Sequence, residues 1–203
     1  MSGERRLWLV RHGETEGQSS VRYHGSNDVP LSDLGRAQIR ALAPWLRDVP
    51  FARVVHSPLV RAAESAAILA ESCGIAAERL VADERLREIC FGQCEGLTAD
   101  EIAARHPEFW ARHRAGTADG FPGGEPRRAF VERVRAAITD WAAADWRSDL
   151  LLVAHRGIVR HALPALLGPG VGEPPEFGVP LASLTVLCAT PNGWQIELLG
   201  ALP

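Results

Sequence analysis

The sequence of 203 residues contains no lysine, so all 22 residues with permanently basic side chains are arginines. The absence of lysine excludes Schiff-base catalysis, a lysine general base and the glycine-rich nucleotide-binding loop that depends on a lysine. Biased codon usage is the simplest explanation of such a composition as a whole. Only arginines that stand beside other chemically active groups therefore need a functional explanation.

Long apolar runs and clustered charges are also missing. No stretch approaches the roughly 18 apolar residues of a membrane span, and residues 1–6 lead into a short strand-like segment, not into the apolar core of a signal peptide. The net charge is -3 and the arginines are scattered, which argues against a nucleic-acid or membrane partner. We therefore expect a soluble, cytoplasmic protein.

Cysteines are few and do not follow a metal-binding pattern. The four of them are Cys73, Cys90, Cys94 and Cys188, and their spacing matches no zinc template. We therefore expect free thiols in a reducing compartment and no metal site.

What the sequence does contain is an alternation of strand and helix patterns, with 46% hydrophobic residues to form a core. Leu7–Val10 and Leu150–Ala154 are short apolar runs typical of buried parallel strands. Weaker strand patterns cover 52–55 and 80–82, and a hairpin pattern joins 183–189 to 194–199. The alternation predicts an α/β fold, a three-layer αβα sandwich with a mainly parallel mixed sheet and an antiparallel edge.

Helical patterns cover residues 32–48, 57–73, 98–106, 127–144 and 158–167. Ser32 is the expected N-cap of the first of these helices, and Ser57, followed by Pro58, that of the second. Thr98 and Glu101 form a capping-box pattern. Residues 116–126 and 168–180 are expected to be loops. We predict one domain, residues 1–203, with a small helical cap-like insertion at about 90–128.

The two buried strands end alike, because each is followed at once by histidine and arginine. Arg11 and His12 end the first strand, and His155 and Arg156 follow the second. Ligands of open parallel sheets bind at the carboxyl ends of the strands, so neighbouring strands would bring both histidines to one crevice. Arg61 lies in the first turn of a predicted helix, where backbone N–H groups favour an anion.

These residues lie in segments that resemble the histidine phosphatase superfamily, also called the phosphoglycerate-mutase-like family. The matching blocks occur in the family's order over residues 7 to about 165. They are Leu9-Val-Arg-His-Gly-Glu-Thr15 with residues 22–38, Ser57-Pro-Leu-Val-Arg-Ala-Ala-Glu-Ser65, Glu88-Ile-Cys-Phe-Gly-Gln-Cys-Glu-Gly-Leu-Thr98, Pro122-Gly-Gly-Glu125 and Val153-Ala-His-Arg-Gly157.

The resemblance implies a role for each of five residues. His12 would be the nucleophile that forms a phosphohistidine, while Arg11, Arg61 and His155 would bind the phosphoryl oxygens. Glu88 would protonate the leaving alcohol and then act as base for water. Two guanidinium groups and an imidazolium would supply the charge that metal ions supply elsewhere, so we expect no cofactor.

Proton transfer sets further requirements on two of these side chains. His12 must be neutral to attack phosphorus, and Glu88 must be protonated to donate. We therefore expect the surroundings of Glu88 to raise its pKa. The alternative is that Glu88 is a surface carboxylate paired with Arg85 or Arg87.

The sequence departs from the family pattern at four positions. Members commonly carry asparagine at Gln18, tryptophan at Cys94, serine at Pro126 and glycine at Arg156. Gln18, Arg22 and Arg156 complete the set expected to bind substrate, and His24 could line the mouth of the pocket. Arg156 would either reach a second anionic group of the substrate or be solvated, and the sequence favours neither.

The resemblance implies a metal-independent phosphomonoesterase acting on a small phosphorylated metabolite. A phosphoglycerate mutase is the alternative, although the loop 91–98 and the compact segment 88–155 look more like those of phosphatases. A third possibility, a noncatalytic phosphate-binding module, would be expected to have lost His12 or Glu88.

The substrate and the oligomeric state stay open at this stage. The superfamily includes enzymes for phosphorylated sugars, phosphoglycerate derivatives, α-ribazole phosphate, phosphoserine and phosphoproteins. Specificity is expected to depend on residues 97–128, in which Phe109, Trp110 and Phe121 would either touch substrate or pack the cap. A homodimer could form along the exposed edge at 183–199.

Overall fold

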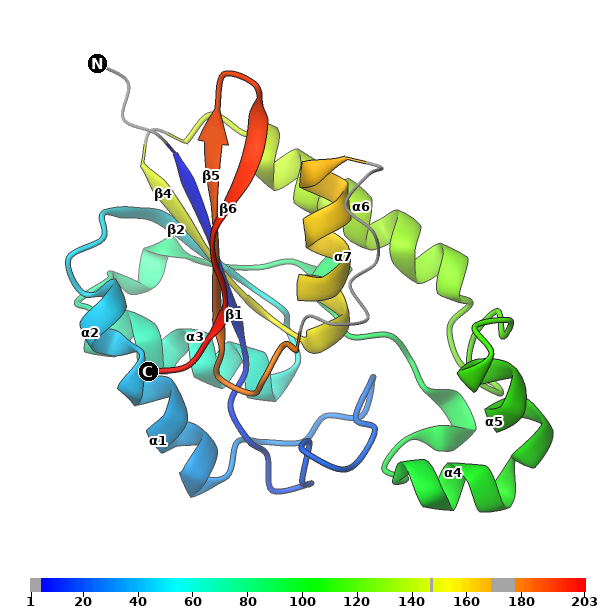
Figure 1. The fold of residues 1–203 in the computed structure, drawn as a ribbon. Helices are drawn as coiled ribbons and strands as arrows, with labels where there is room; N and C mark the ends of the chain where they lie inside the picture. Colours follow the sequence, from blue (N-terminus) through cyan, green and yellow to red (C-terminus); the bar gives the residue numbers. More distant parts are fainter. Residues whose placement is uncertain (1–4, 147, 169–177) are drawn as a thin grey trace.

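A single mixed sheet of six strands, in the order β3-β2-β4-β1-β5-β6, organises the molecule (Figure 1). The computed structural model describes residues 5–146, 148–168 and 178–203. The four strands β3, β2, β4 and β1 are parallel, whereas β5 is antiparallel to β1 and β6 to β5. The predicted α/β fold is therefore confirmed. The strands are β1 (Arg6–Arg11), β2 (Phe51–His56), β3 (Leu80–Ala82), β4 (Asp149–Ala154), β5 (Leu184–Thr190) and β6 (Gly193–Ala201).

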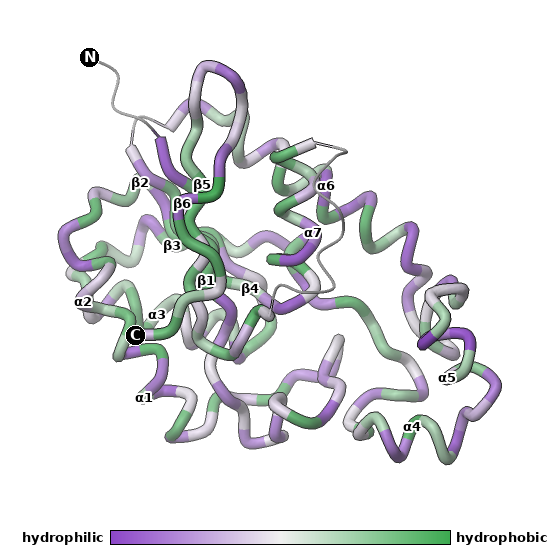
Figure 2. The backbone as a smooth tube through the Cα atoms, viewed as in Figure 1, coloured by the Kyte–Doolittle hydropathy of each residue, from purple (hydrophilic) through white to green (hydrophobic). Residues whose placement is uncertain are grey.

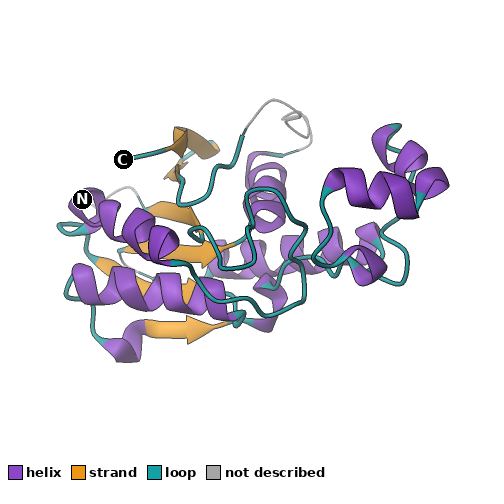
Figure 3. Cartoon of the chain, turned by 90° about the horizontal axis from the view of Figure 1, so that it is seen from below, coloured by secondary structure: helices purple, strands orange, loops and turns teal. Residues whose placement is uncertain are grey.

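Helices cover both faces of the sheet (Figures 1 and 3). One face packs against α1 (Asp33–Ala41), α2 (Ala43–Leu46) and α3 (Val60–Ser72), and the other packs against α6 (Arg127–Ala143) and α7 (Arg156–Leu167). Because side chains alternate along a strand, β4 contributes Leu150 and Leu152 to one core and Leu151 and Val153 to the other. In Figure 2, hydrophobic residues gather along the central strands, whereas hydrophilic and hydrophobic residues alternate along α6.

Two further helices, α4 (Ala99–Arg105) and α5 (Pro107–Arg114), lie apart from the sheet near the carboxyl ends of β1 and β4 (Figures 1 and 3). They share a small apolar cluster of their own, formed around Cys94, Leu97, Ile102 and Phe109. This arrangement fits the cap-like insertion expected at about 90–128, whose extent stays a prediction. Short 3₁₀ turns occupy Ala77–Arg79, Glu84–Leu86 and Gly92–Cys94.

Most of the expected helix boundaries are confirmed. The Ser32 hydroxyl accepts the N–H of Gly35, and Thr98 and Glu101 form the predicted capping box. The helix expected at 32–48 is divided into α1 and α2, because Pro44 lacks the N–H that would continue the helical hydrogen bonds. Helix α5 was not expected, although Pro107 occupies its first position.

Ser57 is not the N-cap of α3, which corrects the sequence-based expectation. The helix begins at Val60, and Leu59 has an extended backbone with ψ of 135°. The N–H of Val60 donates to the carboxylate of Asp28 at 2.6 Å, so a residue from the loop after β1 satisfies this end of the helix. The Ser57 hydroxyl is thereby available for another contact.

Two further expectations concern the loop at 168–180 and the hairpin that follows it. The expected loop at 168–180 lies mostly outside the described residues, since 169–177 are not described. The hairpin is confirmed as β5 and β6. Among the residues that the structure describes, no helix is long and apolar enough to span a bilayer.

Candidate active site

His12 and His155 lie against each other at the carboxyl ends of two adjacent strands. Strands β1 and β4 pair in parallel with Arg11 opposite Ala154, so the next residue of each strand reaches the same edge of the sheet. The two imidazole rings are 5.2 Å apart, centroid to centroid, at an interplanar angle of 62°. Both are buried, with His12 only 3% exposed. The expectation that adjacent strands bring the two histidines together is confirmed.

The hydrogen bond of His12 assigns its tautomer. Nδ1 lies 2.8 Å from the carbonyl oxygen of Gly13, which can only accept, so Nδ1 carries the proton and Nε2 has a free lone pair. Burial, then the charges of Arg61 and Arg11, hold the pKa of His12 well below its ordinary value. His12 is therefore neutral at neutral pH, as nucleophilic attack requires.

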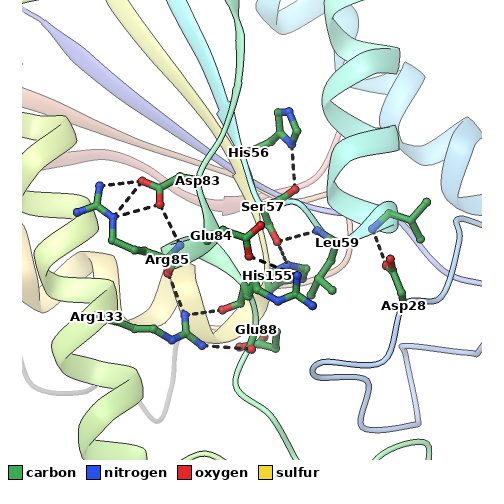
Figure 4. A network of polar contacts seen from close by, with 12 residues as sticks. Asp28, His56, Ser57, Leu59, Asp83, Glu84, Arg85, Glu88, Arg133 and His155 are labelled. Carbon is green, nitrogen blue, oxygen red and sulfur yellow. Dashed lines mark hydrogen bonds and ion pairs between the residues drawn. The ribbon is translucent and has the colours of Figure 1, made fainter.

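His155 is held by Ser57 (Figure 4). Its Nε2 lies 2.8 Å from the Ser57 hydroxyl oxygen, which already accepts the N–H of Leu59 at 3.3 Å. The hydroxyl can donate its proton to Nε2, which would leave the ring proton on Nδ1, or it can accept the proton of Nε2. Nδ1 is buried and has no hydrogen-bond partner among the described residues.

His155 is uncharged in this environment, contrary to the imidazolium expected from the sequence. Burial is the largest cause that holds its pKa well below the ordinary value, followed by the charges of Arg61, His12 and Arg11. The physical reason is that two guanidinium groups already concentrate positive charge in a site with little water.

Arg11 and Arg61 are anchored by backbone carbonyl groups. Arg11 donates from Nη1 to Val179 at 2.6 Å, and the fully buried Arg61 donates to the carbonyl oxygens of His24, Gly25 and Asn27 at 2.7–3.1 Å. Burial lowers the pKa of Arg11 to about 10, so it keeps its charge at neutral pH. The Nε atoms of both arginines are buried without a partner among the described residues.

Two buried N–H donors, Arg11 Nε and Arg61 Nε, and the buried atom His155 Nδ1 thus have no partner among the described residues. A buried donor without an acceptor costs about 1–3 kcal/mol. An oxyanion with several oxygens is the ligand that satisfies several such donors together.

Glu95 holds the loop that anchors Arg61. Its carboxylate accepts the N–H groups of Gly25 and Ser26 at 2.8 Å, that of Phe91 at 2.9 Å and the Ser26 hydroxyl at 3.0 Å. Sequence reasoning placed Glu95 in a family block but did not predict this role. The contacts span about 70 residues of sequence, so no local pattern could reveal them.

Glu88 is buried at the start of α7, with 7% of its surface exposed. Its two carboxylate oxygens accept the N–H groups of Ile89 at 3.0 Å and Gly157 at 2.9 Å. The alternative pairing with Arg85 or Arg87 is wrong. Arg85 pairs with Asp83 and Asp140, and Arg87 with Glu84.

The backbone around Glu88 is fixed from α6. Arg133 donates to the carbonyl oxygens of Arg85, Arg87 and Glu88 at 2.7–3.3 Å (Figure 4). Its guanidinium also pairs with Glu125 at 2.7 Å. Glu125 closes the Gly-Gly-Glu block noted in the sequence, whose contribution is therefore to hold Arg133.

The remaining expected site residues lie farther from the histidines. Gln18 is exposed and has a left-handed backbone with φ of 60°, a conformation that asparagine adopts more readily than glutamine. Arg22 donates to the Gly96 carbonyl at 2.7 Å and pairs with Glu101 at 2.9 Å, which ties the loop after β1 to α4. Substrate contacts from Gln18 and Arg22 stay predictions.

His24 and Arg156 have different surroundings. His24 donates from Nε2 to the Gly17 carbonyl at 2.5 Å, and it lies close enough to His12 to act on its pKa. Arg156 is exposed at the first position of α7 and lines a cavity beside Glu88.

The aromatic residues of the cap form a contiguous cluster. Phe121 lies 4.6 Å from Phe91, 5.1 Å from Phe109 and 5.8 Å from Tyr23, centroid to centroid. Phe109 is buried in the cluster, whereas Phe121, Phe91 and Tyr23 also line the cavity beside Glu88. The expected packing of the cap is therefore observed, whereas contact of Phe121 with substrate stays a prediction.

The described part of the chain contains no disulfide between the cysteines. Cys94 and Cys188 are buried, and Cys73 and Cys90 are partly buried. In the part of the chain that the structure describes, no group of three or more His, Cys, Asp or Glu residues is arranged to hold a metal ion.

Known proteins that are similar to this chain include phosphatases and a probable phosphoglycerate mutase. Glucosyl-3-phosphoglycerate phosphatase of Mycolicibacterium vanbaalenii is 35% identical over 181 residues, covering 86% of this chain and 79% of that protein. A probable phosphoglycerate mutase GpmB of an Enterobacter species is 35% identical over 170 residues, covering 83% and 75%. A solved mycobacterial glucosyl-3-phosphoglycerate phosphatase in complex with VO3 has a TM-score of 0.82 at 32% identity, covering 97% and 99%.

A family model adds the broadest evidence, since it matches nearly the whole chain. The family is described as the histidine phosphatase superfamily (branch 1), and the match covers residues 7–201. The resemblance of the sequence blocks, the sheet topology and the pair of buried histidines agree with it. This chain belongs to the histidine phosphatase superfamily.

Proposed function

We propose that the protein is a phosphomonoesterase that transfers the phosphoryl group of a small phosphorylated metabolite to His12 and then to water. One observation carries the proposal. The free Nε2 of a neutral, buried His12 lies in a site where two N–H donors, on Arg11 and Arg61, and the Nδ1 atom of His155 have no partner among the described residues. Such donors stabilise the equatorial oxygens of a phosphoryl group in the transition state of its transfer.

In the first step, His12 Nε2 attacks phosphorus and the bond from phosphorus to the ester oxygen breaks. The proton of Glu88 moves to that oxygen, and the alcohol leaves. The Glu88 carboxylate is held in place for this transfer by the backbone N–H groups of Ile89 and Gly157, which it accepts at 3.0 and 2.9 Å.

In the second step, water attacks the phosphohistidine and Glu88 takes the proton from it. The phosphorus–nitrogen bond breaks, inorganic phosphate leaves, and His12 returns to its neutral form. The covalent intermediate divides one slow displacement into two easier ones. Arg11 and Arg61 remain charged throughout and neutralise the phosphoryl oxygens in place of a metal ion.

A phosphoglycerate mutase is the second candidate, because a probable mutase is among the relatives at 35% identity. A mutase would use the same histidine but would return the phosphoryl group to a second position of the substrate. The phosphatase is favoured by the compact cap of two short helices between Glu88 and His155 and by relatives whose names specify phosphatases.

The test uses p-nitrophenyl phosphate and 3-phosphoglycerate, each with EDTA present. We expect phosphate release from p-nitrophenyl phosphate that EDTA does not change, and a loss of at least about 10³-fold in kcat for His12→Ala. Conversion of 3-phosphoglycerate to its 2-phospho isomer without phosphate release would identify a mutase. Absence of both reactions would favour a noncatalytic phosphate-binding module, and activity lost with EDTA would contradict the role given to the arginines.

A further inference from the structure

A cavity of about 590 Å³ adjoins the phosphoryl site on the side of Glu88. Glu88 lines it, whereas His12, Arg11, Arg61 and His155 do not. Because the proposed acid protonates the leaving oxygen, the rest of the leaving group must lie on this side. The cavity is therefore the leaving-group pocket of the proposed reaction, and its chemistry reports on the substrate.

The charge of this cavity is strongly biased. The described residues that line it include four arginines and one carboxylate, that of Glu88. The arginines come from three separate elements: Arg114 from α5, Arg127 from α6, and Arg156 and Arg160 from α7. A concave surface with one sign of charge concentrates ligands of the opposite sign. The lining also includes the aromatic rings of Tyr23, Phe91, Phe121 and Phe130.

The placement of Arg156 is unfavourable for the fold alone. It is the first residue of α7, where the helix dipole disfavours a cation, and Arg160 follows one turn later on the same face. Its charge also opposes that of Arg11, whose pKa is lowered first by burial and further by Arg156. Family members commonly have glycine here, so the fold does not require an arginine.

Arg156 also acts on an aromatic residue of the same cavity. Burial raises the pKa of the Tyr23 hydroxyl, and the charge of Arg156 counteracts this in part. The Arg156 guanidinium is thus within electrostatic range of both Arg11 in the phosphoryl site and Tyr23 in the cavity lining.

We propose that Arg156 and Arg160 form a subsite for a second anionic group, so that the preferred substrate is a phosphomonoester whose leaving group itself carries a carboxylate or a phosphate. This inference rests on the proposed function, since the acid role of Glu88 defines the leaving-group side. The two guanidinium groups would bind the second anion in the cavity while the scissile phosphate lies at His12.

The test compares pairs of substrates that differ in the second anion. The carboxylate arm uses 3-phosphoglycerate and glycerol 3-phosphate, which has a hydroxymethyl group in place of the carboxylate. The phosphate arm uses fructose 1,6-bisphosphate and fructose 6-phosphate. We expect a preference of about tenfold or more in kcat/KM for the anionic member of at least one pair. In R156Q and R156Q/R160Q this ratio should fall toward one, mainly through KM.

The control is R40Q, which removes an equal charge from an exposed position of α1 outside the cavity and should leave the ratio unchanged. Hydrolysis of p-nitrophenyl phosphate by the wild type tests the chemistry separately. If that substrate is hydrolysed but neither pair is discriminated, or if the ratio survives in R156Q/R160Q, the subsite is refuted while the phosphatase stands. If no phosphomonoester is hydrolysed, both proposals fail.

Discussion

The carboxylate of Glu88 accepts the backbone N–H of Gly157 at 2.9 Å, which joins the proposed acid to the first turn of the helix that follows His155. The acid and the second histidine are thus held by one short segment, although 67 positions separate them in the chain. Any change at this junction should alter proton donation more than phosphate binding.

Replacement of the acid should have an effect that depends on the leaving group. For Glu88→Gln we expect kcat to fall about 100-fold with an alkyl phosphate such as glycerol 3-phosphate, because the alkoxide must be protonated as it leaves. With p-nitrophenyl phosphate the loss should be much smaller, since its leaving group is stable as an anion. Steady-state kinetics on both substrates measure this. Equal losses on both would remove Glu88 from the role of proton donor.

Gly157→Ala should displace Glu88 without removing it. A Cβ at position 157 would lie 2.3 Å from Glu88 Oε1 and 2.9 Å from the Phe130 ring, so the carboxylate must move. We expect kcat on alkyl phosphates to fall about tenfold or more. Gly178→Ala is the control, because among the described residues the atom nearest to its new Cβ would be Pro180 Cδ at 3.9 Å, an ordinary contact distance. Full activity of Gly157→Ala would contradict the need for this close approach.

Stability should fall as the solution becomes acidic. The pKa values of His12 and His155 are held below the ordinary value of about 6.5, so the unfolded chain binds more protons than the folded protein below that pH. Above about pH 6.5 both histidines are neutral in the folded and the unfolded chain, so they do not make stability depend on pH. Below it, each histidine lowers the free energy of unfolding by about 1.4 kcal/mol per pH unit, until the pH reaches its folded pKa.

Urea unfolding at a series of pH values measures this dependence. The His155→Gln variant should show a shallower decline between about pH 6.5 and 5.5 than the wild type, because one of the two groups is gone. His106→Gln, at a partly exposed histidine between α4 and α5, serves as the control. An identical slope in wild type and His155→Gln would show that His155 is not buried in its neutral form.

Glu95→Gln should loosen the loop that anchors Arg61. An amide has one oxygen in place of two, so it cannot accept from Gly25, Ser26 and Phe91 together. We expect a loss of about 1–3 kcal/mol in unfolding free energy and a higher KM for every phosphomonoester. Glu132→Gln, in an exposed pair with Arg128, should change neither quantity appreciably. An unchanged KM in Glu95→Gln would show that the loop held by Glu95 does not affect phosphate binding.

Arg156→Gln should stabilise the protein while it weakens substrate selection. Removal of a cation from the first turn of α7 and from the neighbourhood of Arg160 should raise the unfolding free energy by about 0.3–1 kcal/mol. Arg40→Gln should have the opposite sign, because Arg40 lies in the last turn of α1, where a cation is favourable. Chemical denaturation compares the two variants. Destabilisation by Arg156→Gln would mean that Arg156 supports the fold.

Sequence patterns predicted the strands that carry His12 and His155 because continuous apolar runs are specific to buried parallel strands. They failed at the start of α3. Ser57 has the residue type of an N-cap, but its hydroxyl contacts His155, and Asp28 accepts the N–H of Val60 at this end of the helix. A local pattern cannot predict these contacts, because His155 is 98 positions from Ser57 in the chain and Asp28 is 32 positions from Val60.

The sequence by itself determined the fold class and the identity of the reactive groups, since hydrophobic periodicity and the order of the motif blocks are properties of the chain. Tertiary structure decided their chemical states. The neutrality of His12 and His155, the free Nε2 of His12 and the unpartnered N–H donors depend on burial and on neighbours from distant segments. The sequence left Arg156 undecided between solvent and substrate, and it is the cavity lined from α5, α6 and α7 that supports a role in binding.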